Sequence, residues 1–402
     1  MLIRPLALLL VALVVAPTLA AQEGRSLDLM VNDTGLAIGD AERVNGLRLN
    51  FRDRYLQQVN GINLTIWTPY FNDSTRTRSS DAKTSRFGTV NGLALGLPAT
   101  GAGNINGLGL GLLGVVAEEE FRGIGVGGLA VVSGEEFSGI GVGGLATVAG
   151  DDFSGLGASG LATVGGESFS GIGLGGLAFI AGEEFSGIGG GGLAAIAGEE
   201  ANGALASFGA AISGDDFTGI GLGGLATIAG ASGQGLFTGG LATIVGEDLT
   251  GLAWGGLATI VGEDGRGLMA SNLATIVGED AHGIVTGGLV TIVGDELRGV
   301  QVAGLANIVG DDARWLLVAG LANVGYDING LAVTAGVNRV VDNGEHTGVG
   351  VAPVNWSTGT QRGLMVGIVN YTHTLRGVQV GLVNIVRDNG LARVLPLLNV
   401  GR

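Results

Sequence analysis

The sequence predicts an all-β repeat fold, a β-solenoid of about sixteen residues per coil. A sixteen-residue unit, of which GGLATIVGED is a plain copy, recurs thirteen times over residues 123–325 without a change of register. A fixed short period indicates one structural unit stacked on its neighbours. The 402 residues include 81 glycines and are 46% hydrophobic. This composition excludes collagen, which needs a glycine triplet, and a disordered chain, which lacks apolar residues to bury.

An antiparallel β-meander is the alternative fold, and it would close into an outer-membrane β-barrel. Both faces of such a repeat would be apolar, whereas membrane barrels have a polar interior and aromatic girdles. A solenoid instead turns at glycine corners and buries its large apolar residues. One observation favours the meander. Acid pairs such as Asp151-Asp152 occupy the same place in successive units, and parallel coils would stack these like charges about 4.8 Å apart.

The first segment, residues 1–20, is predicted to be a signal peptide. Arg4 supplies the positive charge, residues 6–16 form the apolar run, and Thr18-Leu19-Ala20 resembles a cleavage site. We therefore expect export to the cell surface, the outer membrane or the extracellular space. The chain has no cysteine, which excludes disulfides and thiolate metal sites.

Residues 21–122 are predicted to form N-terminal capping β units. Residues 45–52 and 60–67 alternate apolar and polar side chains, which is typical of half-exposed strands with their apolar residues facing inward. Residues 72–86 are polar, and we expect a solvated surface loop there.

Residues 123–325 form the regular array. The Leu-Ala pair hardly varies between copies, whereas the next position is Thr, Phe, Ala or Asn. Constrained apolar positions are expected to point inward and tolerant ones outward. We therefore expect Leu257 inside and Thr259 outside. In a solenoid, the threonines would then form an outer column like that of an ice-binding solenoid, or an ordinary exposed strand face.

Residues 326–402 are predicted to be divergent repeats and a C-terminal cap. The last stretch, RVLPLLNVGR, contains Pro396. Proline suits an edge strand, and a solenoid needs atypical ends to prevent end-to-end stacking.

The charge is negative and segregated. The net charge is −16, and residues 118–312 carry 24 acids against three arginines. A long acidic body repels phosphate backbones, so nucleic acid is not an expected partner. Because the acid pairs recur in almost every unit, we interpret them as structural rather than catalytic, and we predict no catalytic or cofactor-binding residue. Hard cations prefer oxygen ligands, which makes adjacent pairs minor Ca²⁺ candidates. These are Glu263, Asp264, Glu279 and Asp280.

Several units resemble a bacterial surface-repeat family first named from Leptospira. The resemblance is carried by GLMVGIVN at 363–370, GVQVGLVN at 377–384, GVQVAGLAN at 299–307 and the opening VNGLRLNFRDR. It implies an exported, surface-associated bacterial repeat protein. The central units differ, because they carry Thr or Ala where that family has Asn.

The expected function is therefore that of a non-enzymatic β-repeat scaffold at the bacterial surface or envelope, with a structural or adhesive role. Its expected partners are an envelope component or a second copy of the chain. The competing class is an outer-membrane β-barrel protein, and the minor alternatives are a cation-binding or an ice-binding solenoid.

Overall fold

The computed structural model describes residues 26–53, 56–69, 87–388 and 393–402. These residues form 41 strands and no helix. The chain divides into two compact units, Met1–Gly134 and Glu135–Arg402. The predicted signal peptide, residues 1–20, and the predicted polar loop, residues 72–86, lie outside the described residues.

The first unit is a stack of β-coils. Its strands are β1 (Ser26–Val31), β2 (Thr34–Gly39), β3 (Arg43–Asn50), β4 (Gln58–Thr65), β5 (Thr89–Gly96), β6 (Ala99–Ala102), β7 (Asn104–Gly111), β8 (Gly114–Ala117), β9 (Phe121–Gly127) and β10 (Ala130–Ser133). From β2 onward the pairs within this unit are parallel, as between β3 and β4 or β5 and β7.

The second unit repeats one coil design. In its first coil, β11 (Phe137–Gly143) has seven residues and β12 (Ala146–Ala149) has four. Gly144 and Leu145 form the corner between them, and Gly150, Asp151 and Asp152 form the corner that leads to the next coil. The alternation of one long and one short strand accounts for the sixteen-residue period.

Long and short strands alternate through most of this unit. The long strands are β13 (Phe153–Ser159), β15 (Phe169–Gly175), β17 (Phe185–Gly191), β19 (Ala201–Ser207), β21 (Phe217–Gly223), β23 (Gly233–Gly239), β25 (Leu249–Gly255), β27 (Gly265–Ser271), β29 (Ala281–Gly287), β31 (Leu297–Ala303), β33 (Asp312–Ala319), β35 (Asp327–Thr334) and β37 (Glu345–Val351). The short strands are β14 (Ala162–Gly165), β16 (Ala178–Ala181), β18 (Ala194–Ala197), β20 (Ala210–Ser213), β22 (Ala226–Ala229), β24 (Ala242–Val245), β26 (Ala258–Val261), β28 (Ala274–Val277), β30 (Val290–Val293), β32 (Ala306–Val309), β34 (Ala322–Gly325), β36 (Val337–Val340) and β38 (Val354–Ser357).

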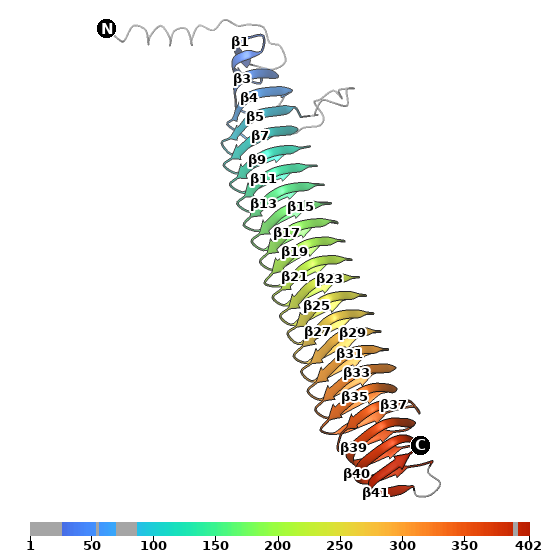
Figure 1. Cartoon of the computed structure of the whole chain (residues 1–402). Helices are drawn as coiled ribbons and strands as arrows, with labels where there is room; N and C mark the ends of the chain where they lie inside the picture. Colours follow the sequence, from blue (N-terminus) through green and yellow to red (C-terminus); the bar gives the residue numbers. More distant parts are fainter. Residues whose placement is uncertain (1–25, 54–55, 70–86, 389–392) are drawn as a thin grey trace, which may run out of the picture. The chain divides into compact units, whose positions relative to one another are not determined.

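Strand pairing in this unit confirms the predicted solenoid (Figure 1). Each long strand pairs in parallel with the long strand one coil away, so that Phe137 lies beside Phe153 and Gly139 beside Gly155. The short strands do the same, with Thr147 beside Thr163. Parallel pairing between coils excludes the antiparallel meander.

A glycine at the same position of every long strand from β11 to β31 allows the coil to bend, and in β33 that position is Trp315, which also has a positive φ of 104°. Gly155 and Gly171 both have φ of 128°, a region that side-chain-bearing residues rarely adopt. A Cβ placed on Gly155 would lie 2.0 Å from the carbonyl oxygen of Gly139 in the preceding coil. The recurrent glycine at the start of the sequence unit is therefore favoured by backbone geometry and by close stacking.

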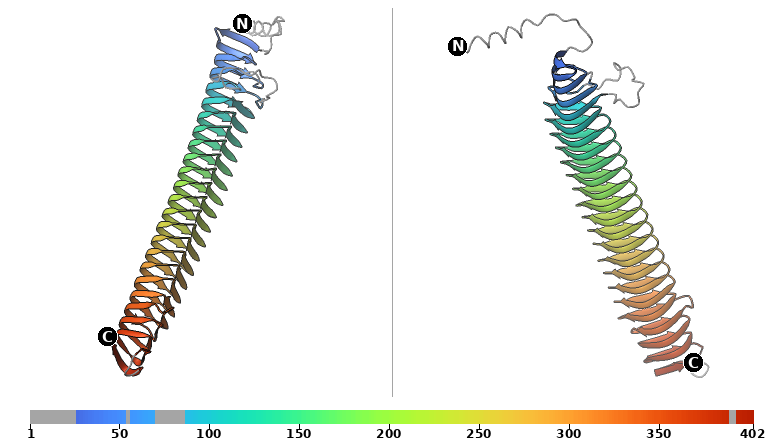
Figure 2. Two further views of the ribbon diagram at one scale, coloured as in Figure 1. Left: turned by 90° about the vertical axis from the view of Figure 1, so that its right-hand side faces the viewer. Right: turned by 45° about the horizontal axis from the view of Figure 1, so that its top comes forward.

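The last coils join the two strands of the repeat into one. The strands β39 (Thr360–Thr372) and β40 (Thr374–Val386) have 13 residues each, and β39 pairs with both β37 and β38. The final strand, β41 (Val394–Gly401), runs antiparallel to β40 and contains Pro396 (Figure 2). In the first unit, β1 likewise runs antiparallel to β2. Reversal of the chain thus ends the parallel ladder at each terminus.

The structure contradicts the predicted inward and outward faces. Thr259 is fully buried, whereas Leu257 is 46% exposed. Seven threonines of this column are buried, so they form no outer ladder: Thr147, Thr163, Thr227, Thr243, Thr259, Thr275 and Thr291. The coil interior is too narrow to hold the leucines and isoleucines that were predicted to point inward. A Cβ on the inward-facing Gly141 would already lie 2.6 Å from Cγ2 of Thr147.

The interior of each regular coil from 137 to 296 has room for one large side chain in the long strand. Phe137 and Phe217 each lie four residues before a glycine, Gly141 and Gly221, which makes room for the ring. In β23 the order is reversed, with Gly233 followed by the buried Phe237. Leu249 with Ala253 and Gly265 with Met269 follow the same rule. The two positions compensate each other in volume, as close-packed interiors require.

Candidate functional site

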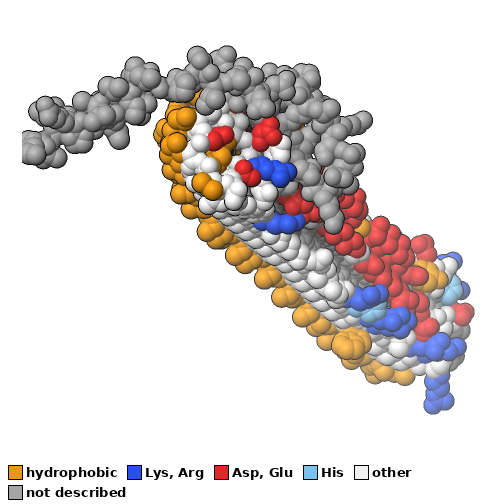
Figure 3. All heavy atoms as spheres, turned by 90° about the horizontal axis from the view of Figure 1, so that it is seen from above, with side chains coloured by type: hydrophobic (Ala, Val, Ile, Leu, Met, Phe, Trp, Pro, Cys, Tyr) orange, Lys and Arg blue, Asp and Glu red, His pale blue; other side chains and the backbone are white. Residues whose placement is uncertain are grey.

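Most large aliphatic residues of the second unit's coils lie on the outside. They occupy the two outward positions in the second half of the long strand and the second residue of the following corner. We call this surface the apolar ridge. Its exposed members are Ile140, Val142, Leu145, Leu161, Ile172, Leu174, Leu177, Ile188, Leu193, Ile220, Leu222, Leu225, Leu236, Leu241, Leu252, Trp254, Leu257, Leu273, Ile284, Leu289, Val302, Leu305 and Leu321. Figure 3 shows hydrophobic side chains gathered in a row.

The ridge extends from coil to coil because the register places equivalent residues of successive coils side by side. Ile140 lies beside Leu156 in the next coil, and Leu161 donates its backbone N–H to the carbonyl of Leu145 at 2.8 Å. Exposed apolar patches of more than a few hundred Å² on soluble proteins usually mark interaction sites. The ridge is therefore the strongest candidate for a functional surface.

The other corner of each coil carries the acid pairs, which we call the acidic edge. The backbone N–H of Glu279 donates to the carbonyl of Glu263, and that of Glu263 to the carbonyl of Glu247, each at 3.0 Å. The acids therefore stack in one column, as the solenoid interpretation requires. In Figure 3 the acidic side chains form a red band separate from the hydrophobic row.

The second acid of several pairs has a structural role. Oδ1 of Asp264 accepts a hydrogen bond from the backbone N–H of Asp280 at 3.2 Å, and its Oδ2 accepts one from Arg266 at 3.1 Å. Oδ1 of Asp280 in turn accepts from the N–H of Glu296 at 3.0 Å. These carboxylates satisfy corner amides that no strand pairing reaches.

The structure brings the four Ca²⁺ candidates, Glu263, Asp264, Glu279 and Asp280, onto adjacent coils. However, no group of three or more acids or histidines among the described residues is arranged to hold a metal ion. Calcium binding at these residues stays a prediction. Desolvation and the charges of Glu279, Glu247, Asp248 and Asp264 raise the pKa of Glu263 above its ordinary value.

Inside the stack, one column of the short strands holds buried polar side chains. Oγ1 of Thr259 donates to the carbonyl of Ala270 at 2.6 Å, and five other threonines of the column bond to a backbone carbonyl in the same way. Thr291 donates instead to Oδ1 of Asn307 at 2.6 Å. From β32 onward the same column holds asparagines: Asn307, Asn323, Asn338, Asn355, Asn370 and Asn384. Each amide donates to the side-chain oxygen of the next at 2.8–3.0 Å.

The C-terminal coils also bury a histidine. His346 is 2% exposed in β37, and burial lowers its pKa to about 4. A neutral imidazole inside the stack fits a packing role. It belongs to the polar interior rather than to a solvent-accessible site.

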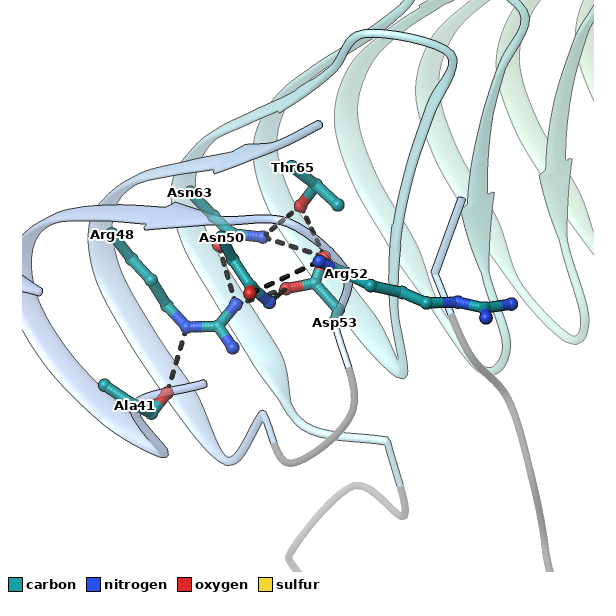
Figure 4. Close-up of polar contacts among 7 residues, drawn as sticks. All are labelled: Ala41, Arg48, Asn50, Arg52, Asp53, Asn63 and Thr65. Atoms are coloured by element: carbon teal, nitrogen blue, oxygen red, sulfur yellow. Dashed lines mark hydrogen bonds and ion pairs between the residues drawn. The ribbon is translucent and has the colours of Figure 1, made fainter. Parts of the chain in front are cut away.

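The first unit contains a buried ion pair, drawn in Figure 4. Arg48 and Asp53 form the pair, and Nε of Arg48 donates to the carbonyl of Ala41 at 2.9 Å. Thr65 and Asn63 also donate to Asp53, at 2.5 and 3.4 Å. In β3 and β4 the polar side chains of Arg48, Asn50, Asn63 and Thr65 are buried, so the inward face of these half-exposed strands is polar. The network satisfies most of its buried groups and ties β3 and β4 to the segment that follows β3.

No helix among the described residues has the length and hydropathy of a membrane span. Comparison with protein-family models, with curated proteins and with solved structures found no match.

Proposed function

We propose that this chain is an exported, non-enzymatic β-repeat scaffold of the bacterial surface or envelope, which acts through its apolar ridge. The observation that carries the proposal is that the ridge recurs at equivalent positions in successive coils. A catalytic site needs one unique constellation of groups, whereas a structural or adhesive surface needs area and repetition. The predicted signal peptide supports export.

The inward placement of Thr and Asn supports the same proposal. These residues are fully buried, so the polar groups of the column hold the coils together. The aliphatic residues that a globular protein would bury are left on the surface. Burial of these side chains against another surface would therefore stabilise the contact by about 25 cal/mol for each Å² of apolar surface removed from water.

The test has two parts. Export is measured by fractionating bacteria that express the full chain and by treating intact cells with protease, where we expect the protein outside the cytoplasm and accessible to protease. The ridge is tested by replacing Leu241, Leu257 and Leu273 with Thr, which keeps β-propensity but removes apolar area.

The purified triple variant should bind less to an alkyl-coated surface than the natural chain does. The control replaces Glu247, Glu263 and Glu279 with Gln, which changes the acidic edge and leaves the ridge intact. Cytoplasmic retention would contradict export, and equal surface binding by the ridge variant and the natural chain would contradict the role of the ridge.

A further inference from the structure

The apolar ridge is interrupted in one coil of the second unit, which contains β19 and β20. Gly209 stands where neighbouring coils have Leu193 and Leu225. Immediately before it, Phe208 occupies a corner position that is glycine in the two flanking coils, Gly192 and Gly224. Phe208 is 86% exposed, so its ring projects from the corner as a knob.

A hollow lies beside this knob. It has a volume of about 550 Å³, and its lining includes Leu174, Gly190, Ala206 and Leu222 from one outward column, together with Phe208 itself. Register places Gly190 between Leu174 and Ala206 in that column. Since glycine and alanine replace larger aliphatic residues there, the hollow is a notch in the ridge.

We propose that the ridge is an interface between two copies of this chain, with Phe208 of each copy seated in the hollow of the other. This inference deepens the proposed function and rests on it, because it names the partner of the ridge. A knob and a notch side by side on one surface are what a two-fold contact requires, since the same patch must complement itself. Phe208 lines its own hollow, so the two rings would meet there in the offset or edge-on geometry that aromatic pairs prefer.

The knob and the deepest part of the notch lie one coil apart, which indicates the orientation. Gly190 belongs to β17, and Phe208 follows β19 in the next coil. A two-fold axis perpendicular to the stack and between these coils exchanges the two levels. The two copies are then antiparallel along the ridge.

The area of the ridge favours a second copy, and the charge of the chain does not oppose it. About this axis the ridge from Ile140 to Leu257 of one copy faces that of the other, and this part contains 17 exposed aliphatic or aromatic side chains in addition to Phe208. A standard protein–protein interface uses about 20–30 residues on each side. The acidic edge lies at the other end of the four-residue short strand, about 13 Å away along that strand. This separation exceeds the Debye length of about 10 Å at 0.1 M salt, so the negative edges do not prevent association.

The test compares the mature chain with two variants by sedimentation velocity over a range of concentrations. Phe208→Gly removes the knob and restores the residue of the neighbouring coils. Gly190→Leu fills the notch with the residue present at Leu174 and Leu222. We expect a concentration-dependent dimer for the natural chain and at least about tenfold weaker dimerisation for each variant.

The matched control is Val302→Leu, which enlarges a ridge residue of the same column far from the hollow and should leave the dimer unchanged. Circular dichroism and thermal unfolding check that each variant keeps its fold. A natural chain that stays monomeric at the highest concentration would overturn the proposal. A dimer that survives both Phe208→Gly and Gly190→Leu would overturn it as well.

Orientation and other occupants are tested separately. Because the chain has no natural cysteine, single cysteines can be introduced at Leu177 and Leu225 and spin-labelled for distance measurement. Antiparallel copies give a short Leu177-to-Leu225 distance in mixed dimers, and parallel copies contradict the proposed axis. Flotation with phosphatidylcholine vesicles addresses lipid, and Phe208-dependent lipid binding by monomers would replace the second copy as the occupant.

The two proposals fail in different experiments. Dimerisation is measured with purified protein and does not depend on export. An exported monomer would leave the surface scaffold standing and remove the dimer, whereas a cytoplasmic dimer would do the reverse.

Discussion

The coils from β21 to β30 and those from β31 to β40 fill the inner column of the short strand with different polar residues. In the first group the inner column of the short strand is threonine. Its hydroxyl bonds to a backbone carbonyl as far as β28, as Thr243 does with Trp254 at 2.8 Å, whereas Thr291 in β30 donates to Oδ1 of Asn307. In the second group it is asparagine, which bonds both to backbone and to the next asparagine, as Asn355 does with Val366 and Asn370. In both groups the buried polar side chains of the column have hydrogen-bond partners.

The difference shows what the fold requires at this column. Phe179, Ala195 and Ala211 occupy it in three other coils, and all are buried. The position therefore accepts apolar or polar side chains as long as volume is filled and hydrogen bonds are completed. Variation between copies marks adaptation to the neighbouring interior residues rather than exposure to solvent.

The largest expected effect comes from breaking the volume rule in the threonine coils. Phe237→Ala should cost about 3–5 kcal/mol, because it removes the large side chain of its coil. The double change Gly233→Phe with Phe237→Gly should recover much of this loss, because it recreates the arrangement of Phe217 and Gly221. Chemical unfolding of the three proteins, together with local hydrogen exchange, measures the difference.

The single variant Gly233→Phe is the control for that swap. A Cβ on Gly233 already lies 3.1 Å from the ring of Phe237, so two rings would overpack the coil, at a cost of about 1–3 kcal/mol or more. A double variant no more stable than Phe237→Ala would contradict the one-large-residue rule.

The second prediction separates the two regions by pH. His346 is neutral in the folded chain because burial lowers its pKa from 6.5 to about 4. In the unfolded chain His346 binds a proton more readily. The contribution of the neutral imidazole to folding stability is therefore fully present above pH 6.5 and is lost as the pH falls from 6.5 to about 4. The full loss is on the order of 3 kcal/mol.

Hydrogen exchange should show this loss in β37 and β39 and leave the coils around β25 protected. His346→Gln, which places the residue type of Gln361 in the same inner column, should flatten that pH response. An identical acid response in the variant would assign the effect to other groups.

The third prediction breaks the asparagine ladder at its centre. Asn338 accepts from Asn323 at 2.9 Å and donates to Asn355 at 3.0 Å. Asn338→Ala should cost about 1–3 kcal/mol, because it leaves buried amide groups short of partners. Asn338→Thr is the matched comparison, since threonine serves this column in β26. If the alanine variant unfolds at the same denaturant concentration as the natural chain, the ladder contributes nothing to stability.

Part of this structure could be predicted from the sequence. The repeat and its glycine corners favoured parallel coils over the antiparallel meander, and the stacked acids follow once the coils are parallel. Alternation along a strand has period two, so it separates the two faces without telling which is inside. Which face lies inside depends on the width of the coil interior. That width is set by Gly141 and Thr147 as much as by Phe137. A signal was nevertheless present, since Phe and Gly exchange places between β21 and β23. The sequence also shows Phe208 and Gly209 as a departure from the Gly-Leu pair of the neighbouring units.

The smallest expected effect tests the corrected faces directly. Leu257 is about half exposed, so Leu257→Ala should cost only about 0.5–1 kcal/mol in the monomer. Thr259 donates to the carbonyl of Ala270 and accepts from the N–H of Gly255 at 2.9 Å, and Thr259→Ala deprives both buried groups of a partner. That change should cost about 1–3 kcal/mol, so the threonine matters more than the leucine. Both substitutions are best made in the Phe208→Gly background, where a second copy does not cover the ridge. A leucine variant less stable than the threonine variant there would return Leu257 to the interior and remove the ridge on which the proposed interface depends.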